Sequence, residues 1–418
     1  MNIYTTALLI SRILVVSTII STRVIASDIH TAPYHLKPSD INVIHIPSVI
    51  RPFNNQFFLY DLDAIQFDLD SYLRTNMPEF IDKKELITHW SGYYSINPKI
   101  ILTLMEMQSQ IISLPTDKAL DRPFGSLSNQ QNFDAQLQDI LAQLSQRFYA
   151  YEEFQLQNKP QSSEAINAAS FALLGLLNQD VNKRERFKPE SLLELDRFIE
   201  QLSLLFGHQQ DELQLLLSNN KTVANSQSTK GKQPKQQNIP PQDMLQMPWR
   251  IDYSWKSNGA HSHTGSGYPL SSIDVSYNWP RWGQRTYSVA SAHNGTVNVL
   301  SRCQVRVTNS NGWATNYYHM DSLSVSNGQY VDANTVLGVY ASNRNVALCQ
   351  GGSSTGPHLH FSLLKNGRHM SLQDVQFSHY TINVGRSNYD DNCNRFNLYD
   401  LDNNRTVCAW TPLYNSGN

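Results

Sequence analysis

The chain beyond Glu212 contains no glutamate, although the sequence runs to 418 residues. Aspartate is therefore the only side-chain carboxylate in that part of the chain. This absence excludes the His-Glu-x-x-His signature that is common among zinc proteases. It also excludes, for the same part, a glycosidase mechanism that depends on Glu.

Cysteine is also scarce. Four cysteines occur, all in the C-terminal part, and no two of them form a Cys-x-x-Cys pair: Cys303, Cys349, Cys393 and Cys408. The absence of a Cys-x-x-Cys pair argues against a cysteine-rich metal site. In an exported protein an even number of cysteines indicates disulfides; the sequence permits three pairings, of which we favour the sequential one.

Neither an excess of basic residues nor a long apolar run is present. Lys and Arg number 33 against 35 Asp and Glu, which gives no reason to expect a nucleic-acid partner. The one marked apolar run, residues 13–20, follows Arg12 and precedes the small residue Ala26. This pattern predicts a signal peptide over residues 1–26 and a secreted protein that has no membrane segment after cleavage before Ser27.

The length of the chain favours two folded units. Apolar residues recur at helical spacing from Asn97 and again in residues 133–148, 163–177 and 189–217. We therefore expect a region over residues 27–218 that is largely helical after about residue 80. Residues 219–242 are rich in Asn, Gln, Ser, Lys and Pro, which predicts an exposed linker open to cleavage.

Residues 243–418 have a different sequence pattern, in which short β-prone runs are bounded by turn residues. Examples are residues 286–290, 296–300, 304–307 and 336–340, with Asn-Gly turns at positions 294 and 311. The predicted fold class is therefore multidomain, with a mainly α-helical N-terminal part followed by a β-rich domain built on an antiparallel sheet.

Eight of the 13 histidines lie in the β-rich part, and three segments there combine residues suited to a metal. His358 and His360 stand two apart on a probable strand, so their side chains share one face. His261 precedes Asp274 by 13 residues, and His319 follows a pair of tyrosines. Two imidazoles and one carboxylate would make a three-ligand zinc site with one open position. Because no Glu is available, the base would be His or Asp.

These segments resemble the lysostaphin-type zinc endopeptidases, and most closely their β-lytic branch. The resemblance is carried by Ser354–Phe361, by Tyr317-Tyr318-His319-Met320 and by the spacing from Gly259-Ala260-His261 to Asp274. It extends over nearly all of residues 247–414. It implies a secreted zinc-dependent endopeptidase, made as a proenzyme, that hydrolyses Gly-rich peptides and in particular the peptide bridges of peptidoglycan.

The resemblance also implies roles for individual residues. One zinc ion per catalytic domain is expected on His261, Asp274 and His360. The expected catalytic pair is His319 and His358. The family also uses a tyrosine hydroxyl near the zinc, which points to Tyr318 and Tyr389 as transition-state donors, although strict strand alternation would put Tyr317, not Tyr318, on the face of His319. The implied disulfides are Cys303–Cys349 and Cys393–Cys408, and the expected partners are the substrate and the removable N-terminal propeptide, with a monomeric mature form.

Two other classes of function compete with the peptidase: a non-catalytic regulator and a glycosidase. Some relatives of this fold have lost their ligands and act as non-catalytic cell-wall-binding regulators of amidases; the intact ligand set argues against that alternative. The helix around Glu106 resembles the acid-bearing helix of lysozyme-like transglycosylases, but a lone, exposed Glu on an amphipathic helix is the simpler interpretation. We interpret His263 as an exposed loop residue, and His293, His369 and His379 as surface or structural histidines.

Overall fold

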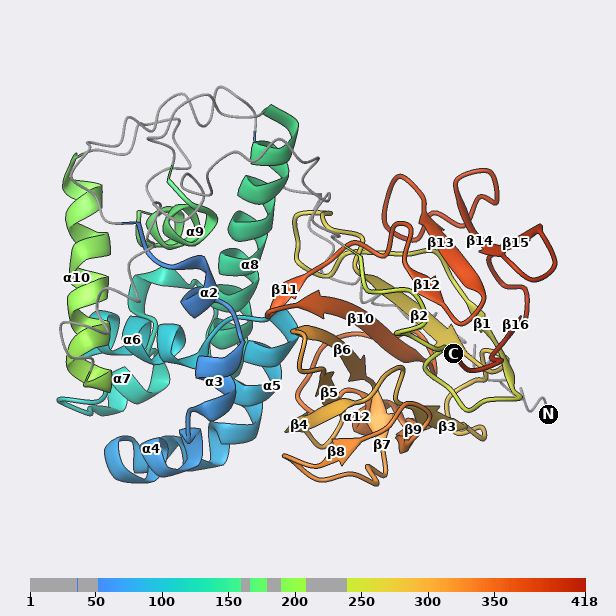
Figure 1. Cartoon of the computed structure of the whole chain (residues 1–418). Coiled ribbons are helices and arrows are strands. Elements are labelled where there is room, and N and C mark those ends of the chain that lie inside the picture. The colour runs from blue at the N-terminus through green and yellow to red at the C-terminus, as the bar shows by residue number, and fades with distance from the viewer. Residues whose placement is uncertain (1–35, 37–51, 159–165, 179–188, 208–238) are drawn as a thin grey trace, which may run out of the picture.

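The computed structural model describes residue 36 and residues 52–158, 166–178, 189–207 and 239–418. The expected signal peptide and nearly all of the expected linker lie outside these residues. Helices gather on one side of the molecule and strands on the other, as predicted (Figure 1). Within the described part of the chain, no helix combines the length and the apolar character needed to cross a bilayer.

The N-terminal region consists of helices, which begin earlier than the expected start near residue 80. The first three are only four to eight residues long, too short for a helical period to stand out in the sequence. The helices are α2 (Asn55–Phe58), α3 (Leu62–Gln66), α4 (Leu69–Asn76), α5 (Lys84–Tyr94), α6 (Pro98–Ser109), α7 (Asp117–Asp121), α8 (Phe133–Asn158), α9 (Ala168–Leu177) and α10 (Pro189–Phe206), with 3-10 turns at Pro78–Lys83 and Gly125–Leu127.

Helix α6 begins where the sequence predicts. The side chain of Asn97 accepts a hydrogen bond from the Lys99 amide, and Pro98 occupies the first turn, where it needs no amide partner. Glu106 near its end is buried, not exposed as expected. Its carboxylate accepts the Ile112 amide at 2.7 Å, so it stabilises the turn after the helix and the glycosidase comparison has no structural support.

The C-terminal region is built from antiparallel pairs. Its largest sheet has the order β16-β1-β2-β10-β6-β5-β4-β8, with β11 added to β10, and sheets of four and three strands flank it. The strands are β1 (Ser254–Ser257), β2 (Ser272–Ser276), β3 (Ser288–Ala290), β4 (Gly295–Ser301), β5 (Gln304–Thr308), β6 (Trp313–Tyr318), β7 (Met320–Asp321), β8 (Tyr330–Val331), β9 (Val336–Tyr340), β10 (Leu359–Lys365), β11 (Arg368–His369), β12 (Gln376–Phe377), β13 (Tyr380–Val384), β14 (Phe396–Asp400), β15 (Arg405–Cys408) and β16 (Leu413–Tyr414), with the short helix α12 (Arg344–Ala347).

Both disulfides are present in the sequential pairing. Cys303 is bonded to Cys349, and Cys393 to Cys408. The first ties the start of β5 to the loop after α12, and the second ties the loop before β14 to the end of β15. Each therefore fixes a loop next to the end of a strand.

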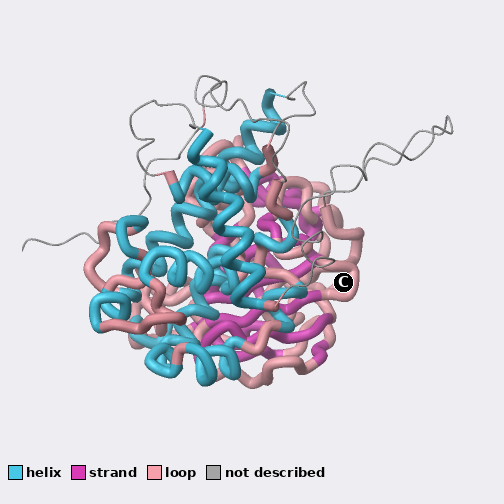
Figure 2. The backbone as a smooth tube through the Cα atoms, turned by 90° about the vertical axis from the view of Figure 1, so that its left-hand side faces the viewer, coloured by secondary structure: helices cyan, strands magenta, loops and turns pink. Residues whose placement is uncertain are grey.

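Each region has its own apolar core. The helical core and the core of the β-rich region share no residue. Between them lies a small apolar cluster in which Leu300 of β4 meets Tyr60 and Ala64. Seen from the helical side, the helices lie in front of the strands (Figure 2). Aromatic contacts such as Tyr93 with Tyr318 and polar contacts such as Arg306 with the Gly92 carbonyl join the regions, and each region retains an apolar core of its own.

Candidate metal centre

The centre of the large sheet brings the expected ligands together through strand register. His360 of β10 lies opposite Asp274 of β2 on one side and Tyr318 of β6 on the other. Residues directly opposite in an antiparallel pair project to the same face. His261 joins the same face through a bridge to Ser272, which lies two residues before Asp274 on β2. Four residues far apart in the sequence thus meet on one face.

Three donor atoms of these residues converge. His360 Nδ1 lies 3.0 Å from Asp274 Oδ1 and 3.2 Å from His261 Nε2. The third side of this triangle, from His261 Nε2 to Asp274 Oδ1, measures 3.6 Å. Tetrahedral zinc with bonds of about 2.1 Å separates its ligand atoms by roughly 3.4 Å. Two imidazole nitrogens and one carboxylate oxygen at these separations fit a zinc ion.

The carboxylate of Asp274 is oriented by a residue that the sequence did not single out. Asn258 donates from Nδ2 to Asp274 Oδ2 at 3.0 Å, and its Oδ1 accepts the Asp274 amide. The other carboxylate oxygen is thereby directed at the histidines. Burial by itself would raise the pKa of Asp274, but His261, His358 and His360 hold that pKa well below its usual value. The carboxyl group is therefore ionised, as a metal ligand must be.

The two remaining histidines of the cluster are held by backbone carbonyls. His319 Nδ1 lies 3.0 Å from the Ala347 oxygen, and His358 Nδ1 lies 2.9 Å from the Gly356 oxygen. A carbonyl only accepts, so each ring carries its proton on Nδ1 and has a basic Nε2. The rings are 4.9 Å apart, and His358 Nε2 is 3.6 Å from Asp274 Oδ1. Burial and then His358 lower the pKa of His319 well below 6.5.

Backbone conformation decides between the two tyrosines of β6. Strict alternation would place Tyr317 beside His319, but β6 ends at Tyr318 and His319 has φ of +64°, in the left-handed region. Alternation therefore stops before His319. Tyr318 stacks on the His319 ring at 4.0 Å, whereas the Tyr317 hydroxyl binds the Ala292 amide within the core.

Tyr389 approaches the cluster from the other side. Its ring stacks on His261 at 4.3 Å, and its amide donates to the Ala260 carbonyl. Tyr318 and Tyr389 thus both lie beside the converging donor atoms.

His263 differs from the expectation of an exposed loop residue. It lies in a loop but is partly buried, with Nδ1 2.9 Å from Ser272 Oγ and Nε2 3.2 Å from His369 Nε2. His293 and His369 are buried and structural. A helical residue covers His263, because its Nε2 is also 3.0 Å from the Tyr93 carbonyl. The sequence could not show this contact between regions.

Comparison with known proteins agrees with this geometry. The family described as "LasA, N-terminal domain" matches residues 51–220, and "Peptidase family M23" matches residues 282–372. "Protease LasA" of Pseudomonas aeruginosa is 53% identical over 381 residues, which span 90% of this chain and 88% of that protein. This chain belongs to the Protease LasA family. It is a zinc-dependent metallopeptidase of the M23 type, and the non-catalytic alternative is not supported.

Two further relatives match the C-terminal region. "Beta-lytic metalloendopeptidase" of Lysobacter enzymogenes is 38% identical over 169 residues, 40% of this chain and 94% of that protein. A solved structure titled "A Novel M23 Metalloprotease Pseudoalterin from Deep-sea" is 50% identical, covers 42% of this chain and 99% of its own, and has a TM-score of 0.40. The M23 match begins after His261 and Asp274, so assigning those two positions depends on the sheet register described above.

Proposed function

We propose that this M23 peptidase is secreted and hydrolyses Gly-rich peptides, in particular the peptide bridges of peptidoglycan, with zinc held by His261, Asp274 and His360. The observation that carries the ligand assignment is the convergence of their three donor atoms within 3.0 to 3.6 Å. Zinc at this position supplies Lewis-acid chemistry, lowering the pKa of water toward about 7 and polarising a carbonyl oxygen. The names of two relatives, "Protease LasA" and "Beta-lytic metalloendopeptidase", support a lytic peptidase.

The catalytic pair follows from the tautomers. His319 and His358 each hold a proton on Nδ1, so Nε2 of either ring can accept the proton that water gives up as it attacks the scissile carbonyl. The protonated ring then returns this proton to the leaving amine. We assign the donation of a hydrogen bond to the developing oxyanion to Tyr318 and Tyr389. In the precursor the Tyr318 hydroxyl is bound to the Gly351 carbonyl at 3.0 Å.

The N-terminal region acts in this proposal as a propeptide that covers the site. Helix α5 supports this role, because the Tyr93 ring packs 4.6 Å from His263, 5.6 Å from Tyr318 and 6.2 Å from His360. A peptide substrate would have to occupy the same space. Burial raises the pKa of the Tyr93 hydroxyl, which therefore stays neutral beside the metal ligands.

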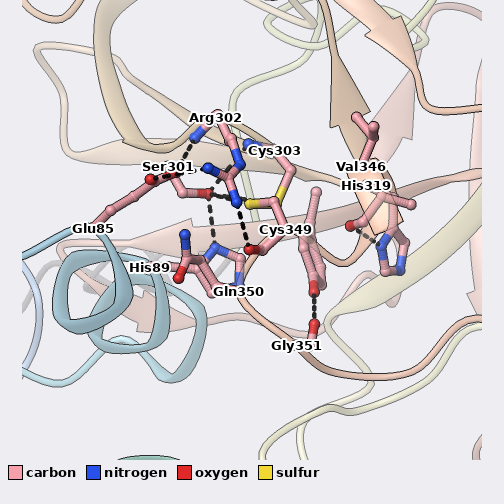
Figure 3. Close-up of a disulfide and its surroundings, with 12 residues drawn as sticks. Glu85, His89, Ser301, Arg302, Cys303, His319, Val346, Cys349, Gln350 and Gly351 are labelled. Atoms are coloured by element: carbon pink, nitrogen blue, oxygen red, sulfur yellow. Dashed lines mark hydrogen bonds and ion pairs between the residues drawn. A yellow bond between two sulfur atoms is a disulfide. The ribbon is translucent and has the colours of Figure 1, made fainter. Parts of the chain in front are cut away.

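Further contacts hold α5 next to the Cys303–Cys349 disulfide (Figure 3). Glu85 accepts the Arg302 amide at 2.8 Å, and His89 Nδ1 is 2.8 Å from Ser301 Oγ. The Trp90 indole donates to the Gln350 carbonyl at 2.9 Å. These are polar contacts between two separate cores, which favours a cover that can be removed after cleavage.

The proposals of secretion and maturation rest on the sequence, and nearly all of the residues concerned lie outside the described ones. The N-terminal 26 residues have the pattern of a signal peptide, and residues 219–242 have the composition of an exposed linker. We propose that cleavage within residues 219–242 yields the mature domain, a monomer. N-terminal sequencing of the secreted, fully active protein tests this; a start at Ser27 would rule it out.

The division of labour among the histidines is tested by zinc analysis. We expect His360→Ala to remove both zinc and activity, and His319→Ala to remove activity while zinc stays bound, since His319 takes no part in the donor triangle. Metal content and peptide hydrolysis are measured on the same purified variants. Equal zinc loss in the two variants would contradict the assignment.

Substrate choice is tested separately. The mature enzyme is expected to cleave pentaglycine and to cleave peptides with Ala or Ser in place of Gly more slowly. Mass spectrometry identifies the products. Equal rates on all three peptides would contradict a preference for residues that lack a β-carbon.

A further inference from the structure

A line of hydrogen bonds runs from the ligand His360 away from the donor triangle. His360 Nε2 is 3.2 Å from Ser362 Oγ, which is 2.9 Å from Ser272 Oγ. Ser272 Oγ is in turn 2.9 Å from His263 Nδ1. Strand register explains the line, because Ser362 lies opposite Ser272 in the row next to His360 and Asp274. Ser362, Ser272 and His360 are buried, and His263 is partly buried.

The direction of these hydrogen bonds is set by His263, at the end of the line that is farthest from the donor triangle. His263 Nε2 lies 3.0 Å from the Tyr93 carbonyl, which can only accept, so Nε2 carries a proton. In the neutral ring Nδ1 is then an acceptor, and Ser272 must donate its single hydroxyl hydrogen to it.

The remaining steps follow because each serine hydroxyl has one hydrogen. Ser272 has used its hydrogen on His263, so Ser362 donates to Ser272. Ser362 has then used its own hydrogen, so His360 Nε2 must donate to Ser362. The proton of the His360 ring is thereby held on Nε2, and Nδ1, the atom in the donor triangle, has its lone pair directed at the metal position.

We propose that Ser362, Ser272 and His263 are positioning residues that hold His360 in the tautomer that binds zinc. This inference rests on the proposed role of His360 as a ligand. His369 Nε2 lies 3.2 Å from His263 Nε2, at the same end of the line.

The test uses the full chain and measures zinc affinity by competition with a chelator. Loss of an outer hydrogen bond to a metal ligand typically lowers metal affinity 10- to 100-fold. We expect a loss in this range for Ser362→Ala and for His263→Leu. His263→Asn should restore affinity to within a few-fold of the parent, because its amide oxygen can accept from Ser272 where Nδ1 did.

Ser276→Ala is the matched control, since Ser276 is a buried serine on the same strand as Ser272 but outside the line of hydrogen bonds. Its zinc affinity should equal that of the parent. A second readout is the ¹⁵N spectrum of labelled histidine, in which His360 should be protonated on Nε2 in the parent chain and lose that preference in Ser362→Ala.

The outcomes separate this inference from the proposed function. A parent chain that binds no zinc, or binds it without His360, contradicts the ligand assignment itself. A parent that binds zinc through His360 while Ser362→Ala and His263→Leu keep its affinity and its Nε2 proton contradicts only the positioning role. If Ser362→Ala fails to fold, the comparison of His263→Leu with His263→Asn decides.

Discussion

Arg306 shows at the scale of one residue how the two regions are joined. It belongs to β5, yet its buried guanidinium donates to the Tyr60 carbonyl at 2.9 Å and to the Gly92 carbonyl at 2.6 Å. It also stacks over the Tyr60 ring. Burial lowers the pKa of Arg306 to about 10, which still leaves it charged at neutral pH. One side chain of the catalytic region thus satisfies two carbonyls of the helical region.

Arg306→Leu should loosen the helical region. The Tyr60 carbonyl would lose its donor and the Gly92 carbonyl would keep only the Ser95 amide, at a cost of roughly 1 to 3 kcal/mol in the stability of the precursor. We expect faster digestion of the helical region by an added protease and a higher hydrolytic activity of the uncleaved chain. The mature domain alone should keep its stability, because the partners of Arg306 lie in the removed part.

Arg302→Leu is the matched control. Arg302 is exposed, and its pair with Glu85 at 3.8 Å is of the weak surface kind, worth less than about 1 kcal/mol. Its digestion rate should stay close to that of the parent. Equal effects of the two substitutions would mean that general charge, not the buried hydrogen bonds, holds the regions together.

Helix α5 packs against the histidine cluster through Tyr93, and its close approach depends on Gly92. A Cβ at this position would lie 2.5 Å from Cδ1 of the buried Leu300 on β4. Helix and strand therefore touch at a point where only glycine fits, although glycine weakens a helix interior by about 0.5 to 1 kcal/mol relative to alanine.

Gly92→Ala should consequently strengthen α5 as a helix but push it off the sheet. The expected result is an uncleaved chain with measurable peptide hydrolysis and weaker protection of α5 amides from hydrogen exchange. Gly175→Ala on α9 is the control, since its Cβ would meet only the movable side chain of Arg147. If the uncleaved Gly92→Ala chain shows no peptide hydrolysis, α5 is not the element that excludes substrate.

On the scale of the whole molecule, Glu152 links the contact between regions to pH. This residue of α8 pairs with Arg368 of β11 at 2.8 Å. Burial raises the pKa of Glu152 to about 7, and Arg368 offsets only part of this effect. The usual pKa of a Glu side chain is 4.5. Between pH 4.5 and pH 7, Glu152 therefore holds a proton in the native protein that it has released in the unfolded chain.

The sign of the pH effect follows. The contribution of Glu152 to stability is greatest below pH 4.5, falls as the pH rises to about 7, and is constant above that. Between pH 5.5 and 7 the fall is at most about 2 kcal/mol. Buried histidines such as His89 and His293, whose pKa burial lowers, change stability in the opposite direction, so the decline is measured as the difference in urea unfolding free energy between the parent and Glu152→Gln at several pH values. The same difference taken with the neighbouring Glu153→Gln should stay constant with pH; a difference between the parent and Glu152→Gln that does not fall from pH 5.5 to 7 would contradict the assignment.

The sequence alone determined the local features of this protein. The helical period of residues 133–148, the Asn97-Pro98 start of α6, the short strands and the expected ligand residues all depend on near neighbours in the chain, so pattern and resemblance could predict them. The short helices before residue 80 were missed because fewer than three turns show no clear period.

Tertiary structure decided what depends on register and on contact between regions. The positive φ of His319 brings Tyr318, not Tyr317, to the site. The regular alternation of side chains along a strand does not predict this interruption. The pairing of Ser362 with Ser272 and the burial of His263 under Tyr93 join residues separated by 90 and 170 positions. Such contacts follow from the packing of complete sheets and helices, which a linear pattern does not encode.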